Sequence, residues 1–191
     1  CRTLHIEPDA LSAIVATGYG RNNIPFATRT KTEITCHARG AHALNPAVRT
    51  IIDIGGQDSK YIQLEPAGEG DGLRLKDFSV SSMCASGTGS FLDQQATRLG
   101  LDIETEFGEA ALRSRAPARI AGRCSVFAKS DMIHLQQKGT PVEDIVAGLC
   151  HALARSFKAN VVGVKALELP VALVGGVAAN AGVVKALRSV L

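Results

Sequence analysis

Residues Asp53–Lys60 read Asp-Ile-Gly-Gly-Gln-Asp-Ser-Lys and follow a short apolar run, where a buried strand is expected to turn. The adjacent glycines Gly55 and Gly56 let backbone N–H groups approach an anion such as phosphate closely. A carboxylate at the strand end, Asp53, suits Mg²⁺, and Gln57 can orient a water that attacks a terminal phosphate. The pattern predicts a phosphate site, and the alternative is a hairpin turn with a structural aspartate.

A second pair of glycines, Gly175 and Gly176, lies between an apolar strand and a helix in the segment Val174–Asn180. N–H groups at the start of such a helix favour anions, although close helix–strand packing alone also explains the glycines. Two such turns on buried strands can hold one nucleotide from two sides. Neither is a P-loop, because GxxxxGK[ST] does not occur. The turn Gly87–Gly89 is interpreted mainly as a helix cap, with phosphate contact as the alternative.

Two of the five cysteines, Cys84 and Cys124, each precede an expected helix. The positive end of a helix favours thiolate, and thiolates bind iron–sulfur clusters. One chain supplies two ligands where a [4Fe–4S] cluster needs four, and a two-fold dimer would supply the rest. The alternative is a pair of small buried side chains, which is our interpretation of Cys36 and Cys150 within their helices. No ligand spacing connects the histidines, which we interpret as surface or satisfied core: His37, His42, His134 and His151.

Apolar periodicity predicts the elements that position these residues. The expected strands are 12–16, 49–54, 59–64, 73–80 and 169–174. The expected helices are 32–44, 88–99, 107–114, 125–138, 140–164 and 179–191. Thr140 is the expected cap of the fifth helix, with Pro141 at its first position. A three-stranded meander followed by helices, a strand and a helix indicates an α/β lobe with a mixed sheet.

The composition, with 46% apolar and 20% charged residues in 191, is that of a folded protein rather than a disordered one. Basic residues are scattered and tryptophan is absent, which argues against nucleic-acid binding. No apolar run has the length of a membrane span and no signal peptide is visible, so no membrane partner is expected. The odd number of cysteines favours the reducing cytoplasm. Because the first residue is Cys1 rather than Met, we expect a fragment.

Four segments resemble the BadF/BadG/BcrA/BcrD-type ATPases, the family of CoA-substrate-specific activases that includes the 2-hydroxyacyl-CoA dehydratase activators. They are DIGGQDSK (53–60), CASGTGSFLDQQA (84–96), CSVFAKSDMIHLQQKGTPVEDIVAGL (124–149) and LVGGVAANAGVV (173–184). TGYGR (17–21) and TEITCHARGA (32–41) resemble the family as well, so the likeness covers nearly the whole chain.

The resemblance implies the α/β fold of the actin/Hsp70/acetate–sugar kinase ATPases, with two ribonuclease H-like lobes and a nucleotide between them. It implies ATP or ADP with Mg²⁺ on Asp53, Asp53 and Gln57 as catalytic residues, and one [4Fe–4S] cluster held by Cys84 and Cys124. It also implies the set of nucleotide-binding residues: Gly55, Gly56, Asp58, Lys60, Gly87, Thr88, Gly89, Gly175, Gly176, Val177 and Asn180.

The same resemblance implies an ATP-hydrolysing electron-transfer activator that reduces a 2-hydroxyacyl-CoA dehydratase, or a related CoA-thioester reductase, through a cluster shared across a homodimer. Reduced ferredoxin or flavodoxin is the expected electron donor. Residues 1–48 would be the remainder of an N-terminally truncated first lobe, and residues 49–191 the second lobe with the cluster-binding helices and adenosine loop. The family's opening DxGS-type phosphate loop is absent, so the fragment alone is expected to bind ATP weakly or not at all and to be inactive by itself.

Two departures point away from the small activators. They carry an Asn-Asp-Lys-like stretch where this chain has residues 81–83, and an acidic residue where it has Lys129. The sequences that follow the two cysteines, SFLDQQA and FAKSDMIHLQQ, instead resemble those of the long fused activase-related proteins. The alternatives are therefore a sugar or small-molecule kinase-like ATPase with incidental cysteines, and a non-catalytic regulatory module of a fused protein.

Overall fold

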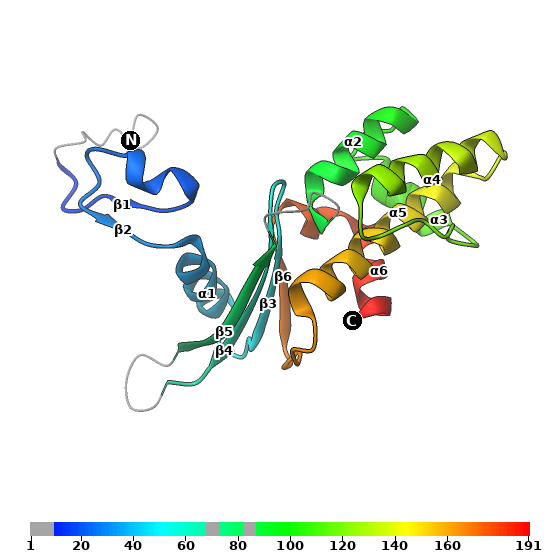
Figure 1. Ribbon diagram of the computed structural model, residues 1–191. Helices are drawn as coiled ribbons and strands as arrows, with labels where there is room; N and C mark the ends of the chain where they lie inside the picture. The colour runs from blue at the N-terminus through cyan, green and yellow to red at the C-terminus, as the bar shows by residue number, and fades with distance from the viewer. Residues whose placement is uncertain (1–9, 68–72, 82–86) are drawn as a thin grey trace.

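The centre of the molecule is a four-stranded mixed sheet in the order β5-β4-β3-β6. The computed structural model describes most of the chain: residues 10–67, 73–81 and 87–191. Strands β3 (Thr50–Ile54), β4 (Ser59–Glu65) and β5 (Arg74–Ser81) form an antiparallel meander, and β6 (Val171–Val174) runs parallel to β3. The predicted α/β lobe with a mixed sheet is therefore confirmed (Figure 1).

Strand β3 is buried throughout, including Thr50 and Asp53, because the sheet is covered on both faces. Successive side chains point to opposite faces. Ile51 and Ile62 pack in a small cluster with residues of the first helix, whereas Ile52, Ile54 and Tyr61 join a large cluster with the later helices. The ends of β3 and β6 are thus held between two hydrophobic layers.

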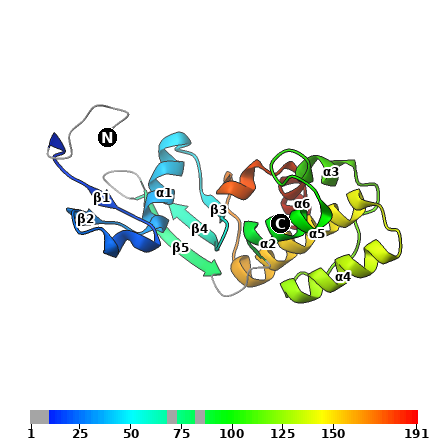
Figure 2. The same ribbon diagram turned by 90° about the horizontal axis from the view of Figure 1, so that it is seen from above.

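Helices cover the two faces unequally (Figures 1 and 2). Helix α1 (Glu33–Leu44) packs on one face through Ala38, and α5 (Val142–Phe157) and α6 (Ala181–Val190) contribute to the large cluster on the other. Further helices complete that side of the molecule: α2 (Gly89–Leu99), α3 (Phe107–Arg113) and α4 (Ser125–Gln137). In the part of the chain that the structure describes, no helix is long and apolar enough to cross a membrane.

The predicted helix 140–164 is not one α-helix. Helix α5 ends at Phe157, and Lys158–Val162 continues as a π-helical turn that stops at Gly163, whose φ is 59°. Pro141, not Thr140, occupies the N-cap position. Val161 and Val162 are buried, so the apolar pattern continues beyond Phe157. The pattern does not reveal that the backbone hydrogen bonding changes at Lys158, which is why the prediction was wrong.

Two further boundaries differ from the prediction. Strand β6 starts at Val171, because the preceding Pro170 has no N–H to donate to the ladder. The last helix is preceded by a 3₁₀ turn, Gly176–Ala179, and begins only at Ala181, where the side chain of Asn180 accepts a hydrogen bond from the N–H of Val183. Asn180 is therefore the N-cap of α6.

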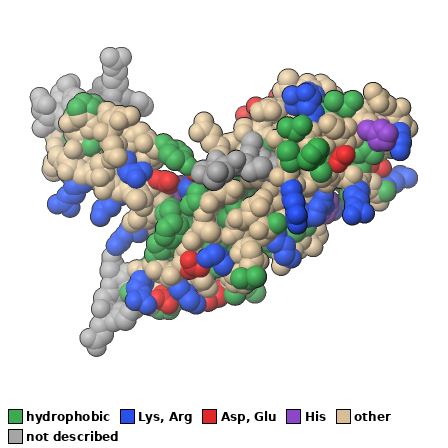
Figure 3. All heavy atoms as spheres, viewed as in Figure 1, with side chains coloured by type: hydrophobic (Ala, Val, Ile, Leu, Met, Phe, Trp, Pro, Cys, Tyr) green, Lys and Arg blue, Asp and Glu red, His purple; other side chains and the backbone are tan. Residues whose placement is uncertain are grey.

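The N-terminal part contains two very short strands. Strand β1 (Val15–Ala16) pairs in parallel with β2 (Arg29–Thr30), which lies outside every predicted strand. A two-residue strand carries too little alternation to be recognised from sequence. Figure 3 shows the molecule hollowed between this N-terminal part and the helical part.

Candidate functional site

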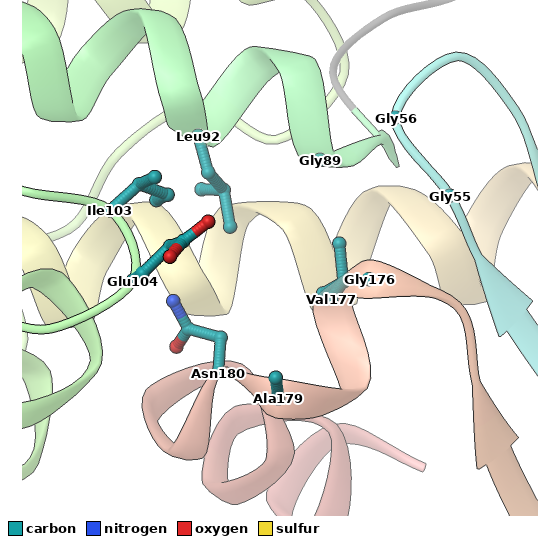
Figure 4. A pocket seen from close by; sticks show the side chains of 10 residues that line it. All are labelled: Gly55, Gly56, Gly89, Leu92, Ile103, Glu104, Gly176, Val177, Ala179 and Asn180. Atoms are coloured by element: carbon teal, nitrogen blue, oxygen red, sulfur yellow. The ribbon is translucent and has the colours of Figure 1, made fainter. Parts of the chain in front are cut away.

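The two glycine turns, far apart in the sequence, lie side by side in the structure. Strands β3 and β6 are parallel neighbours, with Asp53 opposite Val174, so both chains leave the sheet at the same edge. A cavity of about 380 Å³ opens there (Figure 4). Its lining residues are Gly55, Gly56, Gly89, Leu92, Ile103, Glu104, Gly176, Val177, Ala179 and Asn180.

Glycine is required at position 175 for two separate reasons. Its φ is 89°, a conformation that L side chains rarely adopt. A Cβ atom there would also lie 2.4 Å from the carbonyl oxygen of Ile54 and 2.8 Å from Oδ1 of Asp53. The second turn can therefore approach the end of β3 closely only because it has no side chain at this position.

The start of helix α2 is hydrogen-bonded to the first glycine turn. The N–H of Gly89 donates to the carbonyl oxygen of Gly55 at 2.8 Å, and the N–H of Ser90 donates to that of Gly56 at 3.1 Å. Gly89 lines the cavity, but Gly87 and Thr88 are buried and do not belong to the lining. The predicted third turn thus contributes one of its three residues to the cavity wall.

The other end of the cavity is formed by Leu92 of α2 and by the loop that carries Ile103 and Glu104 (Figure 4). Asp102 orders this loop, because its Oδ1 accepts hydrogen bonds from the backbone N–H groups of Glu104 and Thr105 at 3.0 and 2.7 Å. Hydrogen bonds from the Thr105 hydroxyl and backbone hold the pKa of Asp102 below its usual value. Sequence reasoning missed Ile103 and Glu104, and the Asp-x-x-Thr turn spacing is the one local signal for them.

A buried network of charged side chains lies beneath the first turn. The Nζ atom of Lys60 is 2.6 Å from Oδ1 of Asp58 and 3.4 Å from Oδ2 of Asp53, and the Tyr19 hydroxyl donates to Oδ2 of Asp58. Burial opposes the charge on Asp58, but the hydrogen bonds from Lys60 and Tyr19 outweigh it, so the pKa of Asp58 lies below its usual value. Burial likewise opposes the charge on Lys60, but the bond to Asp58 and the nearby Asp53 raise the pKa of Lys60.

Three predicted site residues of this segment, Gln57, Asp58 and Lys60, lie outside the cavity lining. Asp58 and Lys60 are buried against each other, and neither belongs to the cavity lining. Gln57 is exposed at the tip of the turn and does not line the cavity either. His37, interpreted from the sequence as surface or satisfied core, instead places its Nδ1 atom 2.9 Å from Oδ2 of Asp53.

The cysteines have different surroundings. Cys124 immediately precedes α4 and is half-buried, next to Val126 and Phe127, each 65% exposed. Cys84, the other predicted cluster ligand, lies outside the described residues. Cys150 is core as predicted, and burial raises the pKa of its thiol to about 12. Cys36 is half-buried rather than core, with its thiol 3.4 Å from the Thr17 hydroxyl. Among the residues that the structure describes, no three His, Cys, Asp or Glu side chains converge as a metal site.

A mixed sheet whose two glycine turns close on one cavity is the architecture of the actin-like ATPases, and comparison with solved structures confirms this class. The chain matches the BadF/BadG/BcrA/BcrD ATPase family model over residues 1–191, and it belongs to that family.

Individual relatives agree with this membership. A 2-hydroxyisocaproyl-CoA dehydratase activator from Clostridioides difficile is 39% identical over 93% of this chain and 64% of its own length. An activator of lactoyl-CoA dehydratase from Anaerotignum propionicum is 39% identical over 97% of this chain and 69% of its own. A solved 2-hydroxyisocaproyl-CoA dehydratase activator from Clostridium difficile with bound ADPNP superimposes with a TM-score of 0.88 at 37% identity, covering 99% of this chain and 68% of that one. The chain thus spans about two thirds of the length of these relatives.

Proposed function

We propose that this chain carries the nucleotide site of an ATP-hydrolysing electron-transfer activator, whose acceptor is a 2-hydroxyacyl-CoA dehydratase or a related CoA-thioester reductase. The cavity between the two glycine turns is the observation that carries the proposal. Its support is that the relatives at 39% identity are dehydratase activators and that a solved neighbour of the same fold holds ADPNP.

The cavity fits a nucleotide along its length. Backbone at the glycine end suits the phosphates, since N–H groups without side chains can surround an anion. At the far end, the apolar side chains of Leu92 and Ile103 suit a base, and Glu104 and Asn180 supply polar groups for the sugar or the base edge. In Figure 4 the amide nitrogen of Asn180 points toward the side chain of Glu104.

Asp53 is the residue that fits Mg²⁺. Its Oδ2 atom contacts His37 and Lys60, while its Oδ1 atom lies on the side of Gly175, whose neighbour Gly176 lines the cavity. A magnesium ion held through this carboxylate would neutralise phosphate charge. Gln57, exposed on the same turn, keeps its proposed role of orienting the attacking water.

Cys124, together with Cys84, is proposed to hold half of a [4Fe–4S] cluster at a homodimer axis. The described half of this donor set fits, because Cys124 is a half-buried thiol at the start of a helix with exposed apolar neighbours that a second subunit can cover. When bound, the cluster would supply one-electron transfer at low potential. Reduced ferredoxin or flavodoxin is the proposed donor.

The proposal is tested by measuring iron and sulfide in protein reconstituted without oxygen, beside ADPNP binding by calorimetry. We expect about two irons per chain in a dimer. Cys124→Ser should lose the iron, whereas Cys36→Ser, a matched control at a half-buried cysteine, should keep it. ADPNP binding by a folded dimer that holds no iron would reject the activator and favour a kinase-like or regulatory ATPase.

A further inference from the structure

A side chain of α1, His37, makes a close polar contact with Asp53 at the end of β3. Nδ1 of His37 lies 2.9 Å from Oδ2 of Asp53, whose side chain is only 4% exposed, compared with 39% for the histidine. The carboxylate is therefore buried, whereas the histidine that contacts it is partly open to solvent. Nδ1 is itself buried and lies within hydrogen-bonding distance of Oδ2, without a well-aligned hydrogen bond in the described part of the chain, so the contact becomes a hydrogen bond once the ring turns its N–H onto Oδ2.

The two oxygens of Asp53 have different surroundings. Oδ2 faces His37 and, at 3.4 Å, Lys60. Oδ1 lies so close to Gly175 that a Cβ atom at that position would be 2.8 Å away. One oxygen is thus held by basic side chains, while the other faces the turn that borders the cavity.

Lys60 alone does not orient Asp53. Its Nζ atom is 2.6 Å from Asp58 and 3.4 Å from Asp53, so its shorter contact is made elsewhere. The terminal torsion of an aspartate is broad and roughly two-fold, so one distant partner defines the carboxylate plane poorly. His37 supplies a second contact, and its backbone is held because the next residue, Ala38, is buried against the sheet.

From this geometry we propose that His37 is a positioning residue: it holds Oδ2 of Asp53 so that Oδ1 stays beside Gly175, next to the cavity, where a metal would bind. The inference rests on the proposed function, specifically on Asp53 as the magnesium ligand. It extends the site from the glycine turns to a helix in the N-terminal part of the chain.

The test measures Mn²⁺ affinity by EPR in the presence of ADPNP, with ADPNP binding in the absence of metal measured separately. Loss of a residue that orients a metal ligand typically weakens metal binding 10–100-fold. We expect His37→Ala to weaken Mn²⁺ binding by about this factor, with metal-free ADPNP binding unchanged. His37→Asn, which keeps a donor near the position of Nδ1, should restore most of the affinity. His42→Ala is the matched control on the same helix and should bind Mn²⁺ like the wild type.

Asp53→Asn separates the two levels of the proposal. If Asp53→Asn weakens Mn²⁺ binding but a folded His37→Ala or His37→Phe variant does not, the positioning role is wrong and the proposed function stands. If neither substitution changes Mn²⁺ affinity, the assignment of Asp53 as metal ligand is wrong, and the role of His37 falls with it.

Discussion

Replacing Gly175 by alanine is expected to destabilise the protein by about 2–6 kcal/mol. The backbone contributes first: at φ 89° and ψ 168°, a conformation almost confined to glycine, an L side chain costs roughly 1–3 kcal/mol. The new Cβ atom would also lie 2.4 Å from the Ile54 carbonyl oxygen and 2.7 Å from its carbon. Relief of such overlap typically costs about 1–3 kcal/mol, because β3 is held in the sheet on both sides.

The assay is urea unfolding, with Gly176→Ala as the matched control. A Cβ atom at Gly176 meets nothing within 4 Å and its φ is not in the strained region. Its stability should therefore stay within about 1 kcal/mol of the wild type. Gly175→Ala should also weaken ADPNP binding, since the second turn must move away from β3. Equal unfolding midpoints for the two variants would refute the claim that close approach of the turns requires glycine.

Two further predictions concern titratable groups. The folded-state pKa of Asp58 is lowered because hydrogen bonds from Lys60 and Tyr19 outweigh burial, so its stabilisation is complete above the unfolded pKa of about 3.9 and is lost as pH falls through the folded value. Asp58→Asn should lower stability at pH 7 and flatten the loss of stability below about pH 4 in urea unfolding, and a steeper acid loss would contradict this. Burial raises the pKa of Cys150 to about 12, so a thiol reagent at pH 8 should label Cys36 and Cys124 in cluster-free native protein but reach Cys150 only in denaturant. Equal native labelling of Cys150, seen by mass spectrometry, would disprove its burial.

The central sheet could be predicted from the sequence because its signals are local. The segment 49–54 is rich in isoleucine, and the next two strands follow after short polar turns, so the meander follows from chain order alone. Both glycine turns were recognisable for the same reason. That the two turns share one cavity was predicted only by combining two glycine pairs, each weak evidence alone. The parallel register between β3 and β6 brings the two turns together.

The remaining parts of the site depend on contacts that leave no local trace. His37 and Asp53 are separated by a helix, a loop and most of a strand, and no spacing rule connects them. Lys60 stands in the segment predicted to bind phosphate, yet its ammonium group lies between two carboxylates. A basic residue in such a segment can bind the anion or neutralise the neighbouring carboxylates, and only the folded structure shows which of the two it does.

The packing of the helical side also bears on how a nucleotide site could be connected to Cys124. Asn180 lines the cavity and caps α6, whose Gly182 packs so closely that a Cβ atom there would lie 2.4 Å from Cβ of Ala111 and 3.2 Å from Sγ of Cys150. Cys150 belongs to α5, and two glycines continue this close packing toward the loop before α4. A Cβ atom at Gly148 would be 2.4 Å from the carbonyl oxygen of Ala118, and one at Gly122 would be 2.8 Å from that of Ala152.

These contacts leave little free space between α6, α5 and the segment that leads into Cys124. Closely packed interiors do not deform continuously, so displacement of one of these elements must be accommodated by its neighbours. We therefore expect a displacement at the Asn180 end of the cavity to move the start of α4 through packed backbone contacts rather than through a chain of charged side chains. Gly122, Gly148 and Gly182, outside the two glycine turns, thus each permit a contact that a methyl group would force apart.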